Sequence, residues 1–422
     1  MKNVPLRSLL VALAAISFVL TTTPSWAQWV QTATLTGSDG QPRDFFGATL
    51  AVDGNTLVVG ATGRNHAGIA YVFTESNGVW TQVAELSPSD SFFGQNFGGS
   101  IAVSGNTVVV GDGGSARPKS AIYVFVKPAT GWTNMTQTAK LTPSDANPAG
   151  SFPSSLTISN DTIAAGDFQH QVANNQGQGT VYVFVKPATG WTDMTQTAEL
   201  TASDGVANDG LGVSVALKGS TLVAGAGIFS SNSAGAAYVF EKPASGWANG
   251  QQTAKLTASD PKTDATLGLH VAISNDEATI VAGAPGSTLG PDGAAYIFTK
   301  PATGWQNATQ SSELIAPPPA GLGLFGTVAI NGPGTIMAVG APNTMVGFRR
   351  DAGDAYVYRK PATGWPPLPQ ANARLNPPFP ERGGSFGQAM AVRATTVFAG
   401  EFNATVNANP RQGAVYVFDR PR

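Results

Sequence analysis

The sequence predicts an all-β fold, a seven-bladed β-propeller whose four-stranded blades form a ring that the N-terminal strand completes. Three observations support this prediction. A pattern of three short apolar strands recurs seven times, with 52 to 60 residues between equivalent tyrosines. A tryptophan-marked fourth strand follows the first six copies, and a similar segment near the start of the chain matches the fourth strand that the seventh copy lacks. Four strands at a period of this length are typical of a propeller blade.

The first strand of each copy is rich in small residues and opens with Phe-Gly in its clearest copies, such as FGATLAV and FGQAMAV. Short apolar runs bounded by glycine, asparagine and aspartate are typical of strands. We expect this strand to lie innermost in its blade. The seven copies occupy residues 46–52, 97–103, 152–158, 211–217, 267–273, 325–330 and 386–392.

The second strand is an apolar run that ends in glycine, and the third strand carries a tyrosine followed by Val-Phe or a similar pair. Both strands are apolar on both faces, which predicts burial between stacked sheets. The second strands occupy residues 56–60, 107–111, 162–166, 221–225, 279–283, 335–340 and 396–400. The tyrosines of the third strands are Tyr71, Tyr123, Tyr182, Tyr238, Tyr296, Tyr356 and Tyr416.

The fourth strand follows a tryptophan turn, which is K-P-A-[TS]-G-W in five copies, and continues into T-A-x-L. No such segment follows Tyr416, but residues 29–35 (WVQTATL) have the same Trp, Thr-Ala and Leu. Pairing of this segment with the last blade would satisfy strand edges that an open ring leaves exposed. A solenoid or a β-sandwich array is the alternative. Solenoids cap their ends with atypical repeats, whereas these two ends complement one another.

Residues 1–27 have the features of a secretory signal peptide. Lys2 and Arg7 precede a 12-residue apolar run, and Ser25-Trp26-Ala27 offers a cleavage site after Ala27. The run is shorter than the roughly 20 residues that span a bilayer, so we expect no membrane span after its removal. A buried N-terminal helix is the alternative. We therefore expect a secreted or periplasmic protein in which residues 28–422 form one propeller domain.

Composition excludes several classes of site. Hydrophobic residues make up 42% of the chain, which is enough for a large core. The absence of cysteine excludes disulfides, thiolate metal sites and cysteine nucleophiles. Loss of Lys2 and Arg7 would leave 22 basic and 26 acidic residues, a net charge of −4. This balance gives no basic surface for nucleic acid, so we expect no nucleic-acid partner.

The phrases FG-x-x-x-A-V, T-x-V-x-G and G-x-A-Y-V-F together resemble the FG-GAP repeat, the blade motif of integrin α-subunit heads and of many exported bacterial proteins. The resemblance covers residues 29–422 and implies a propeller that makes adhesive or protein–protein contacts. Kelch repeats have a similar period and also combine a glycine-ended strand with tyrosine and tryptophan, but they lack the opening Phe-Gly strand. They are the alternative family, and they too form propellers.

FG-GAP blades often carry a D-x-D-x-D-G calcium loop between their first and second strands, and this chain departs from that pattern. Its corresponding turns are short, as in Asp53-Gly54-Asn55, and suit a tight turn rather than six or more oxygen ligands. We therefore expect no metal and no cofactor. The DG-x-x-x-D segment from Asp204 to Asp209 is the remaining calcium candidate.

The sequence offers no catalytic constellation. His66, His170 and His270 are far apart and lack metal-ligand spacing. His270 falls on a first strand, and its equivalents would form a ring of small residues in the channel: Thr49, Ser100, Ser155, Ser214, Thr327 and Ala389. A recurrent Ser-Asp between blades indicates a structural turn, in which the side chains bond local backbone amides. These aspartates are Asp39, Asp90, Asp145, Asp204 and Asp260.

The loop between the second and third strands varies most among the copies, and variable loops on a rigid frame often carry recognition. Aromatic and arginine side chains are common anchors of binding surfaces. The candidate binding residues are therefore Phe168, His170, Phe229, Phe348, Arg349, Arg350 and Phe402. The alternative is that each aromatic side chain packs into its own blade.

The sequence thus predicts an exported, monomeric, non-catalytic scaffold that binds a protein or makes adhesion-type contacts through these loops. The alternative is a lectin-like propeller that binds a carbohydrate instead of a protein. A third possibility is a polysaccharide lyase or hydrolase, which would need a cluster of carboxylates at the mouth of the channel.

Overall fold

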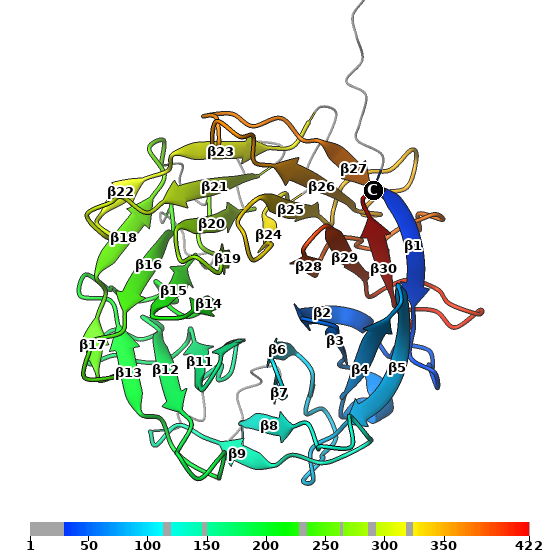
Figure 1. Cartoon of the computed structure of the whole chain (residues 1–422), viewed down its shortest axis with the longest axis horizontal. Coiled ribbons are helices and arrows are strands. Elements are labelled where there is room, and N and C mark those ends of the chain that lie inside the picture. Colours follow the sequence, from blue (N-terminus) through cyan, green and yellow to red (C-terminus); the bar gives the residue numbers. More distant parts are fainter. Residues whose placement is uncertain are drawn as a thin grey trace, which may run out of the picture.

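The computed structural model describes residues 29–112, 120–145, 150–227, 234–261, 265–285, 293–317 and 324–421. Within these ranges the chain forms strands β1 to β30 and one 3-10 turn, η1 (Arg64–His66), and has no α-helix. The strands assemble into seven sheets arranged as a ring, with one sheet per blade (Figure 1). The prediction of an all-β, seven-bladed propeller is confirmed.

Blades 1 to 3 each contain four antiparallel strands, ordered from the centre of the ring outward as they occur in the chain. Blade 1 has β2 (Phe46–Asp53), β3 (Thr56–Ala61), β4 (Ile69–Ser76) and β5 (Val79–Leu86). Blade 2 has β6 (Ser100–Ser104), β7 (Thr107–Gly111), β8 (Ile122–Val126) and β9 (Ala139–Leu141). Blade 3 has β10 (Ser155–Ser159), β11 (Thr162–Asp167), β12 (Thr180–Val185) and β13 (Ala198–Thr201).

Blades 4 to 6 repeat this order. Blade 4 has β14 (Ser214–Lys218), β15 (Thr221–Ala226), β16 (Ala236–Glu241) and β18 (Ala254–Thr257). Blade 5 has β19 (His270–Ile273), β20 (Thr279–Ala284), β21 (Ala294–Thr299) and β23 (Ser312–Ile315). Blade 6 has β24 (Thr327–Ile330), β25 (Ile336–Ala341), β26 (Asp354–Arg359) and β27 (Ala373–Leu375). Two short strands each pair in parallel with the outer strand of the preceding blade. β17 (Gly250–Gln251) pairs with β13 of blade 3, and β22 (Ala308–Thr309) pairs with β18 of blade 4.

Blade 7 combines both ends of the chain. Its inner strands are β28 (Met390–Arg393), β29 (Thr396–Glu401) and β30 (Ala414–Asp419), and its outer strand is β1 (Val30–Leu35). β1 pairs antiparallel with β30, so that Leu35 faces Val415 and Thr34 faces Tyr416. Figure 1 shows β1, in blue, beside β30, in red. Closure of the ring by the N-terminal strand is therefore confirmed.

The hydrophobic core lies between the blades. All residues of β3, β11, β15, β20 and β25 are buried, as their two-sided apolar pattern predicts. The described core divides into seven clusters, and each lies between two neighbouring blades. The Phe of the Phe-Gly motif packs against the third-strand tyrosine of its own blade, as Phe46 does on Tyr71, edge-on and with ring centroids 5.5 Å apart. Each blade thus depends on its neighbours for burial.

Two glycines of the repeat meet at each described blade junction except the one between blades 2 and 3. The penultimate residue of the second strand is a glycine that lies against the backbone carbonyl of the Phe-Gly glycine, or its equivalent, in the next blade. A Cβ added at the second-strand glycine would overlap that carbonyl. The pairs are Gly60 with Gly98, Gly166 with Gly212, Gly225 with Gly268, Gly283 with Gly326, Gly340 with Gly387, and Gly400 with Gly47. At the remaining junction Gly111 meets Ser100 and Pro153.

The propeller has two faces that differ in their connections. The loop face, as we call it, carries the loops between second and third strands and the connections from one blade to the next. The opposite face carries the turns that join first to second strands and third to fourth strands. On the loop face the two kinds of segment bond to one another: Gly94 N donates to His66 O, and Asn208 N donates to Gln176 O.

Two sequence predictions fall on residues that the structure does not describe. The signal peptide with its cleavage site after Ala27 lies outside the described residues, and so does Phe229. In the part of the chain that is described, no helix has the length and apolar character needed to cross a membrane.

Removal of the N-terminal strand should destabilise the whole ring. A chain that starts at Asp39 lacks β1, so β30 loses its outer partner and the edge of blade 7 is exposed. We expect a clearly lower thermal unfolding midpoint than for a chain that starts at Gln28, measured by circular dichroism. Equal midpoints would contradict closure by the N-terminal strand.

Gly400→Ala should destabilise the junction between blades 7 and 1. The added methyl group would overlap the carbonyl of Gly47, and backbone cannot move aside as a flexible side chain can. We expect a loss of about 1–3 kcal/mol in the free energy of unfolding, measured by urea denaturation. Gly250→Ala is the control, because the nearest atom to its new Cβ, Ala248 O, is 3.7 Å away. Its effect should stay within about 0.5 kcal/mol.

Candidate functional site

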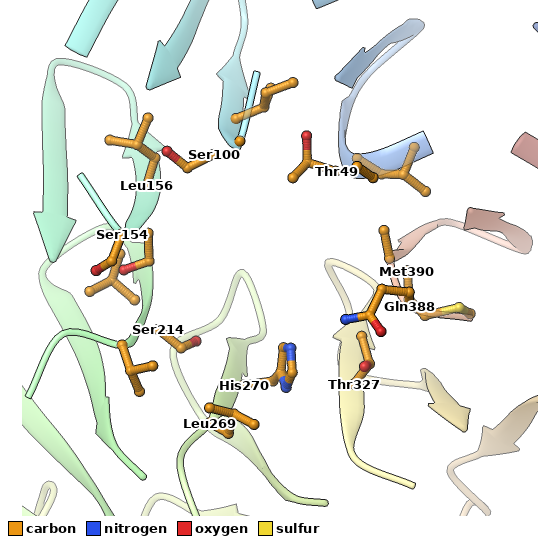
Figure 2. A pocket seen from close by; sticks show the side chains of 18 of the residues that line it. Thr49, Ser100, Ser154, Leu156, Ser214, Leu269, His270, Thr327, Gln388 and Met390 are labelled. Carbon is orange, nitrogen blue, oxygen red and sulfur yellow. The ribbon is translucent and has the colours of Figure 1, made fainter. Parts of the chain in front are cut away.

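The centre of the ring forms a channel lined by the first strands. A cavity of about 340 Å³ occupies its loop-face end, and residues of all seven innermost strands line it (Figure 2). The sequence-predicted ring is confirmed, because its members all line this cavity: Thr49, Ser100, Ser155, Ser214, His270, Thr327 and Ala389. A second cavity of about 230 Å³ follows toward the other face, and its lining is mainly aliphatic.

Hydroxyl groups of the channel ring hold neighbouring blades together. Thr49 Oγ1 donates to Gly98 O of the next blade at 2.6 Å, and Ser155 Oγ donates to Gly212 O at 2.8 Å. Ser100 Oγ likewise donates to Pro153 O at 3.1 Å. These hydroxyls therefore lie where the Phe-Gly segment of the next blade approaches, and their hydrogen bonds explain why small hydroxyl residues recur at this position.

His270 is the one imidazole in the ring. Its Nδ1 is buried and has no hydrogen-bond partner within the described part of the chain. Burial lowers the pKa of His270 to about 4, so the imidazole is neutral at pH 7. Figure 2 shows it beside Leu269 and across the channel from Ser100. Among the described residues that line the two channel cavities there is no Asp or Glu.

The recurrent Ser-Asp turns have a structural role, but their principal partner differs from the expected one. The tyrosine of the third strand donates its hydroxyl to the aspartate that precedes its blade: Tyr71 to Asp39 at 2.8 Å, Tyr123 to Asp90 at 2.9 Å and Tyr182 to Asp145 at 2.9 Å. We expected local backbone amides as partners. The tyrosine instead ties the connection to the middle of the sheet, across more than 30 residues of sequence.

In several blades a basic side chain forms an ion pair with the aspartate that accepts the tyrosine hydroxyl. In blades 2 and 4 it is the lysine of T-A-x-L, since Lys140 pairs with Asp90 and Lys255 pairs with Asp204. Blade 1 has Glu85 at that position, and the cation is Arg64 of the variable loop, which pairs with Asp39. The cation therefore comes from different elements in different blades.

In blade 3 the same place holds an imidazole and two carboxylates. His170 Nε2 lies 3.6 Å from Asp145 Oδ2 and 3.8 Å from Glu199 Oε1, and His170 Nδ1 lies 3.2 Å from the Tyr182 hydroxyl. The sequence singled out His170 as a binding residue of the loop surface. The structure places it beneath that surface, 8% exposed.

The other predicted binding residues differ in exposure. Phe348 is fully exposed, and Arg349 and Arg350 beside it are exposed too. Phe168 and Phe402 are partly buried, and Phe402 packs against Phe45 with ring centroids 6.2 Å apart. Of the predicted binding residues that the structure describes, the three of the blade 6 loop lie together as an exposed group.

The backbone of the blade 6 loop forms a tight hydrogen-bonded turn. Val346 and Arg349 exchange two backbone hydrogen bonds, each 3.1 Å long, and Gly347 between them has a φ of 61°. Phe348 follows Gly347 at the tip of this turn. Blades 3 and 7 form the same turn between Val172 and Asn175 and between Val406 and Asn409. Their residues equivalent to Phe348 are Asn174 and Ala408.

Sequence reasoning missed other exposed aromatics on the loop face, because it compared only the loops between second and third strands. Phe93 (77% exposed) and Phe379 (83% exposed) lie in connections between blades. Phe93 stacks on His66, with ring centroids 5.2 Å apart, beside a cavity of about 430 Å³. Asn65, Ser87, Ser91 and Phe92 are among the residues that line this cavity.

The remaining calcium candidate is engaged within the chain. Asp204 pairs with Lys255, and Asp209 accepts the backbone N–H of Val206 at 2.8 Å. The short turns that replace the family's calcium loop also have protein partners. Asp53 Oδ2, for example, accepts the N–H of Gly105 in the next blade at 2.7 Å.

Buried acids occur at the end of the second strand in three blades. Blades 1, 4, 5 and 6 have alanine there, whereas the other three have Asp112, Asp167 and Glu401. Asp167 accepts the backbone N–H of Ser151 at 2.7 Å. Burial raises the pKa of Asp112 to about 7 and that of Glu401 to about 8. The Glu381 carboxylate adds to the rise at Glu401, and the Tyr416 hydroxyl offsets part of it.

Glu401 should make the protein less stable as the pH rises. Its pKa in the folded state, about 8, lies above the ordinary value of 4.5, so the folded state holds the proton more tightly. The free energy of unfolding should therefore fall between about pH 4.5 and pH 8, by an amount on the order of 5 kcal/mol for full ionisation.

Glu401→Ala, which restores the alanine of four other blades, should reduce the fall measured by urea denaturation at pH 5 and pH 9, while the part due to Asp112 should remain. Asp161→Ala, at a side chain that is 66% exposed, is the control and should leave the pH dependence unchanged. An undiminished fall in the Glu401→Ala variant would contradict the assignment.

Comparison with known protein families agrees with the geometry of the blades. The family model described as FG-GAP repeat matches residues 29–73, 80–125, 135–184, 194–240 and 251–298. No match was found among curated proteins. The matched segments span more than half of the 422 residues, and blades 6 and 7 outside them make the same glycine contacts as the matched blades. The chain therefore belongs to the FG-GAP repeat family.

Proposed function

We propose that this FG-GAP propeller is an exported, non-catalytic scaffold that binds a protein partner, in an adhesion-type contact, through its loop face. The observation that carries this proposal is the blade 6 loop. Its tip displays Phe348 entirely to solvent, with Arg349 and Arg350 beside it. Aromatic and arginine side chains are the commonest anchors of protein interfaces.

The rigidity of the turn supports a binding role. Two backbone hydrogen bonds between Val346 and Arg349 fix the tip, so little conformational entropy would be lost when Phe348 is buried by a partner. Two equivalent turns, in blades 3 and 7, carry Asn174 and Ala408 at this place. The fold of the turn therefore does not require phenylalanine, and the exposed ring contributes nothing to the core.

Other apolar side chains extend the surface around Phe348. Met345 in the same loop is 49% exposed, and the connection to blade 7 carries Phe379. That connection is tied to the loop, because Gly383 N donates to Arg350 O at 2.9 Å. Exposed apolar side chains rimmed by arginine are typical of a protein contact.

The channel offers less support for catalysis. Its described lining consists mainly of hydroxyl and aliphatic side chains, with one neutral imidazole, the Gln388 amide and the Lys218 ammonium, and it contains no carboxylate. General acid–base catalysis on a polysaccharide would need paired carboxylates near the substrate. We therefore assign recognition to the loop face and no reaction to the channel. The proposed location, secreted or periplasmic, depends on the signal peptide predicted at residues 1–27.

A carbohydrate ligand is the second candidate, and the cavity beside Phe93 favours it. An exposed aromatic ring next to the polar side chains of Asn65, Ser87 and Ser91 offers both a stacking surface and hydrogen-bond partners for a sugar. A glycan array tests this alternative. Glycan binding that is lost in Phe93→Ala and retained in Phe348→Ala would favour a carbohydrate ligand at the cavity beside Phe93.

The double variant Phe348→Ala, Arg349→Ala should lose partner binding while it keeps its fold. Both side chains are exposed, so the free energy of unfolding should change by less than about 0.5 kcal/mol for each substitution. Loss of an aromatic and an arginine anchor should weaken binding at least tenfold. The measurement compares proteins that the immobilised wild type and variant retain from the cell-envelope and culture fractions of the source organism.

Leu368→Ala is the matched control. Leu368 is 55% exposed and belongs to blade 6, but it lies between the third and fourth strands, on the opposite face. The same proteins should be retained by this control and by the wild type. Full retention by the double variant would exclude the blade 6 loop as the binding site.

A further inference from the structure

We propose that blade 3 contains a binding site for one divalent transition-metal ion, best suited to Zn²⁺, formed by His170, Asp145 and Glu199. The three side chains come from separate segments: the variable loop after β11, the connection before blade 3, and β13. Each offers one ligand atom, and these atoms all lie within 4.8 Å of one another. One imidazole nitrogen and two carboxylate oxygens are ligands that zinc accepts.

The hydrogen bonds of Tyr182 orient the imidazole for metal binding. A carboxylate can only accept, so the Tyr182 hydroxyl donates to Asp145 Oδ1 at 2.9 Å. The tyrosine oxygen is then left to accept from His170 Nδ1, 3.2 Å away. With the Nδ1 proton held in this way, Nε2 is the ring nitrogen that faces the two carboxylates and can bind a metal. Metal-bound histidines are commonly held in this way through their other nitrogen.

The distances suit a metal better than they suit hydrogen bonds. His170 Nε2 lies 3.6 Å from Asp145 Oδ2 and 3.8 Å from Glu199 Oε1, which is longer than a hydrogen bond. Ligand atoms about 2.1 Å from a tetrahedral zinc ion lie about 3.4 Å from one another. Side-chain movements of a few tenths of an ångström would bring both pairs to that spacing.

Comparison among the blades gives an independent reason to expect a cation here. The equivalent place holds Lys140 in blade 2, Lys255 in blade 4 and Arg64 in blade 1, each paired with the recurrent aspartate. Blade 3 has Glu199 where blades 2 and 4 have the lysine. Among the described residues no lysine or arginine pairs with Asp145 or Glu199, so these two carboxylates face only the His170 imidazole, and a bound dication would balance their charge.

Access and burial also fit a metal site. His170 is 8% exposed, while the side chains of Asp145 and Glu199 are 42% and 25% exposed. The imidazole is thus shielded, yet the carboxylates remain open to the loop face, where an ion could enter and water could occupy a fourth position. The site is separate from the calcium loop of the family, which lies between first and second strands on the opposite face.

Zinc binding can be measured directly by isothermal titration calorimetry. The probe is ZnCl₂ added to the tag-free, chelator-treated and dialysed chain that starts at Gln28, with MnCl₂ and CaCl₂ in parallel titrations. We expect one equivalent of Zn²⁺ to bind, with Ca²⁺ at least tenfold weaker because imidazole is a poor calcium ligand. Zinc should also raise the thermal unfolding midpoint, since an ion that binds only the folded state stabilises it.

Two variants test the assignment of the ligands. Glu199→Lys gives blade 3 the lysine of blades 2 and 4, so it should fold and should weaken Zn²⁺ binding at least tenfold. His170→Gln should do the same by removing the only nitrogen ligand. Both variants should lose the zinc-dependent rise in the unfolding midpoint, which also reports whether each is folded.

His66→Gln and Glu85→Gln are the matched controls. His66 is an exposed histidine of the equivalent loop in blade 1, and Glu85 is the blade 1 equivalent of Glu199. Both controls should keep wild-type affinity. The proposal is overturned if the wild type takes up no stoichiometric zinc, as would occur if His170 were a protonated partner of the two carboxylates. It is equally overturned if the binding survives both test variants or is lost with His66.

Discussion

The closest approach between neighbouring blades, where two glycines meet, is the constraint on which the ring depends. At the junction of blades 4 and 5, for example, Gly225 lies against the carbonyl of Gly268, with no room for a Cβ between them. This contact sets the distance between innermost strands, so the first-strand hydroxyls can reach the next blade, as Thr49 reaches Gly98. The glycine of the Phe-Gly motif is therefore needed because neighbouring blades approach too closely for a Cβ. The phenylalanine of the motif packs on the tyrosine of its own blade and so holds the same segment in place.

A ring fixed at its centre leaves the loop face free to differ between blades. In blades 1, 2 and 3 a tyrosine–aspartate contact ties the preceding connection to the sheet, but the cation that balances the aspartate is Arg64 in blade 1 and Lys140 in blade 2. In blade 3 the His170 imidazole lies at the corresponding place. Similarly, one turn geometry serves blades 3, 6 and 7, with only blade 6 placing an aromatic ring at the tip. Recognition can thus change without any change in the contacts that hold the ring.

The sequence predicted those features that repeat. Seven copies in register were enough to identify the strands, the closing partner of β30 and the residues of the channel ring, because an error in one copy is corrected by the others. Features confined to one blade could not be predicted. Asp145, His170 and Glu199 are separated by 25 and 29 residues, and no local pattern joins them. Whether a loop aromatic is exposed, as Phe348 is, or packed, as Phe402 is on Phe45, depends on neighbours that only the fold brings near.

The joining of both ends of the chain in blade 7 also dictates an order of events during biosynthesis. Thr32 in β1 bonds to Asp419 in β30, 387 residues later, so the first strand to be made must wait for the last one. Until then β1 has no partner strand, and loop closure over so long a segment is slow. Assembly of the ring is therefore a late event, because blade 7 cannot be completed before β30 has been made.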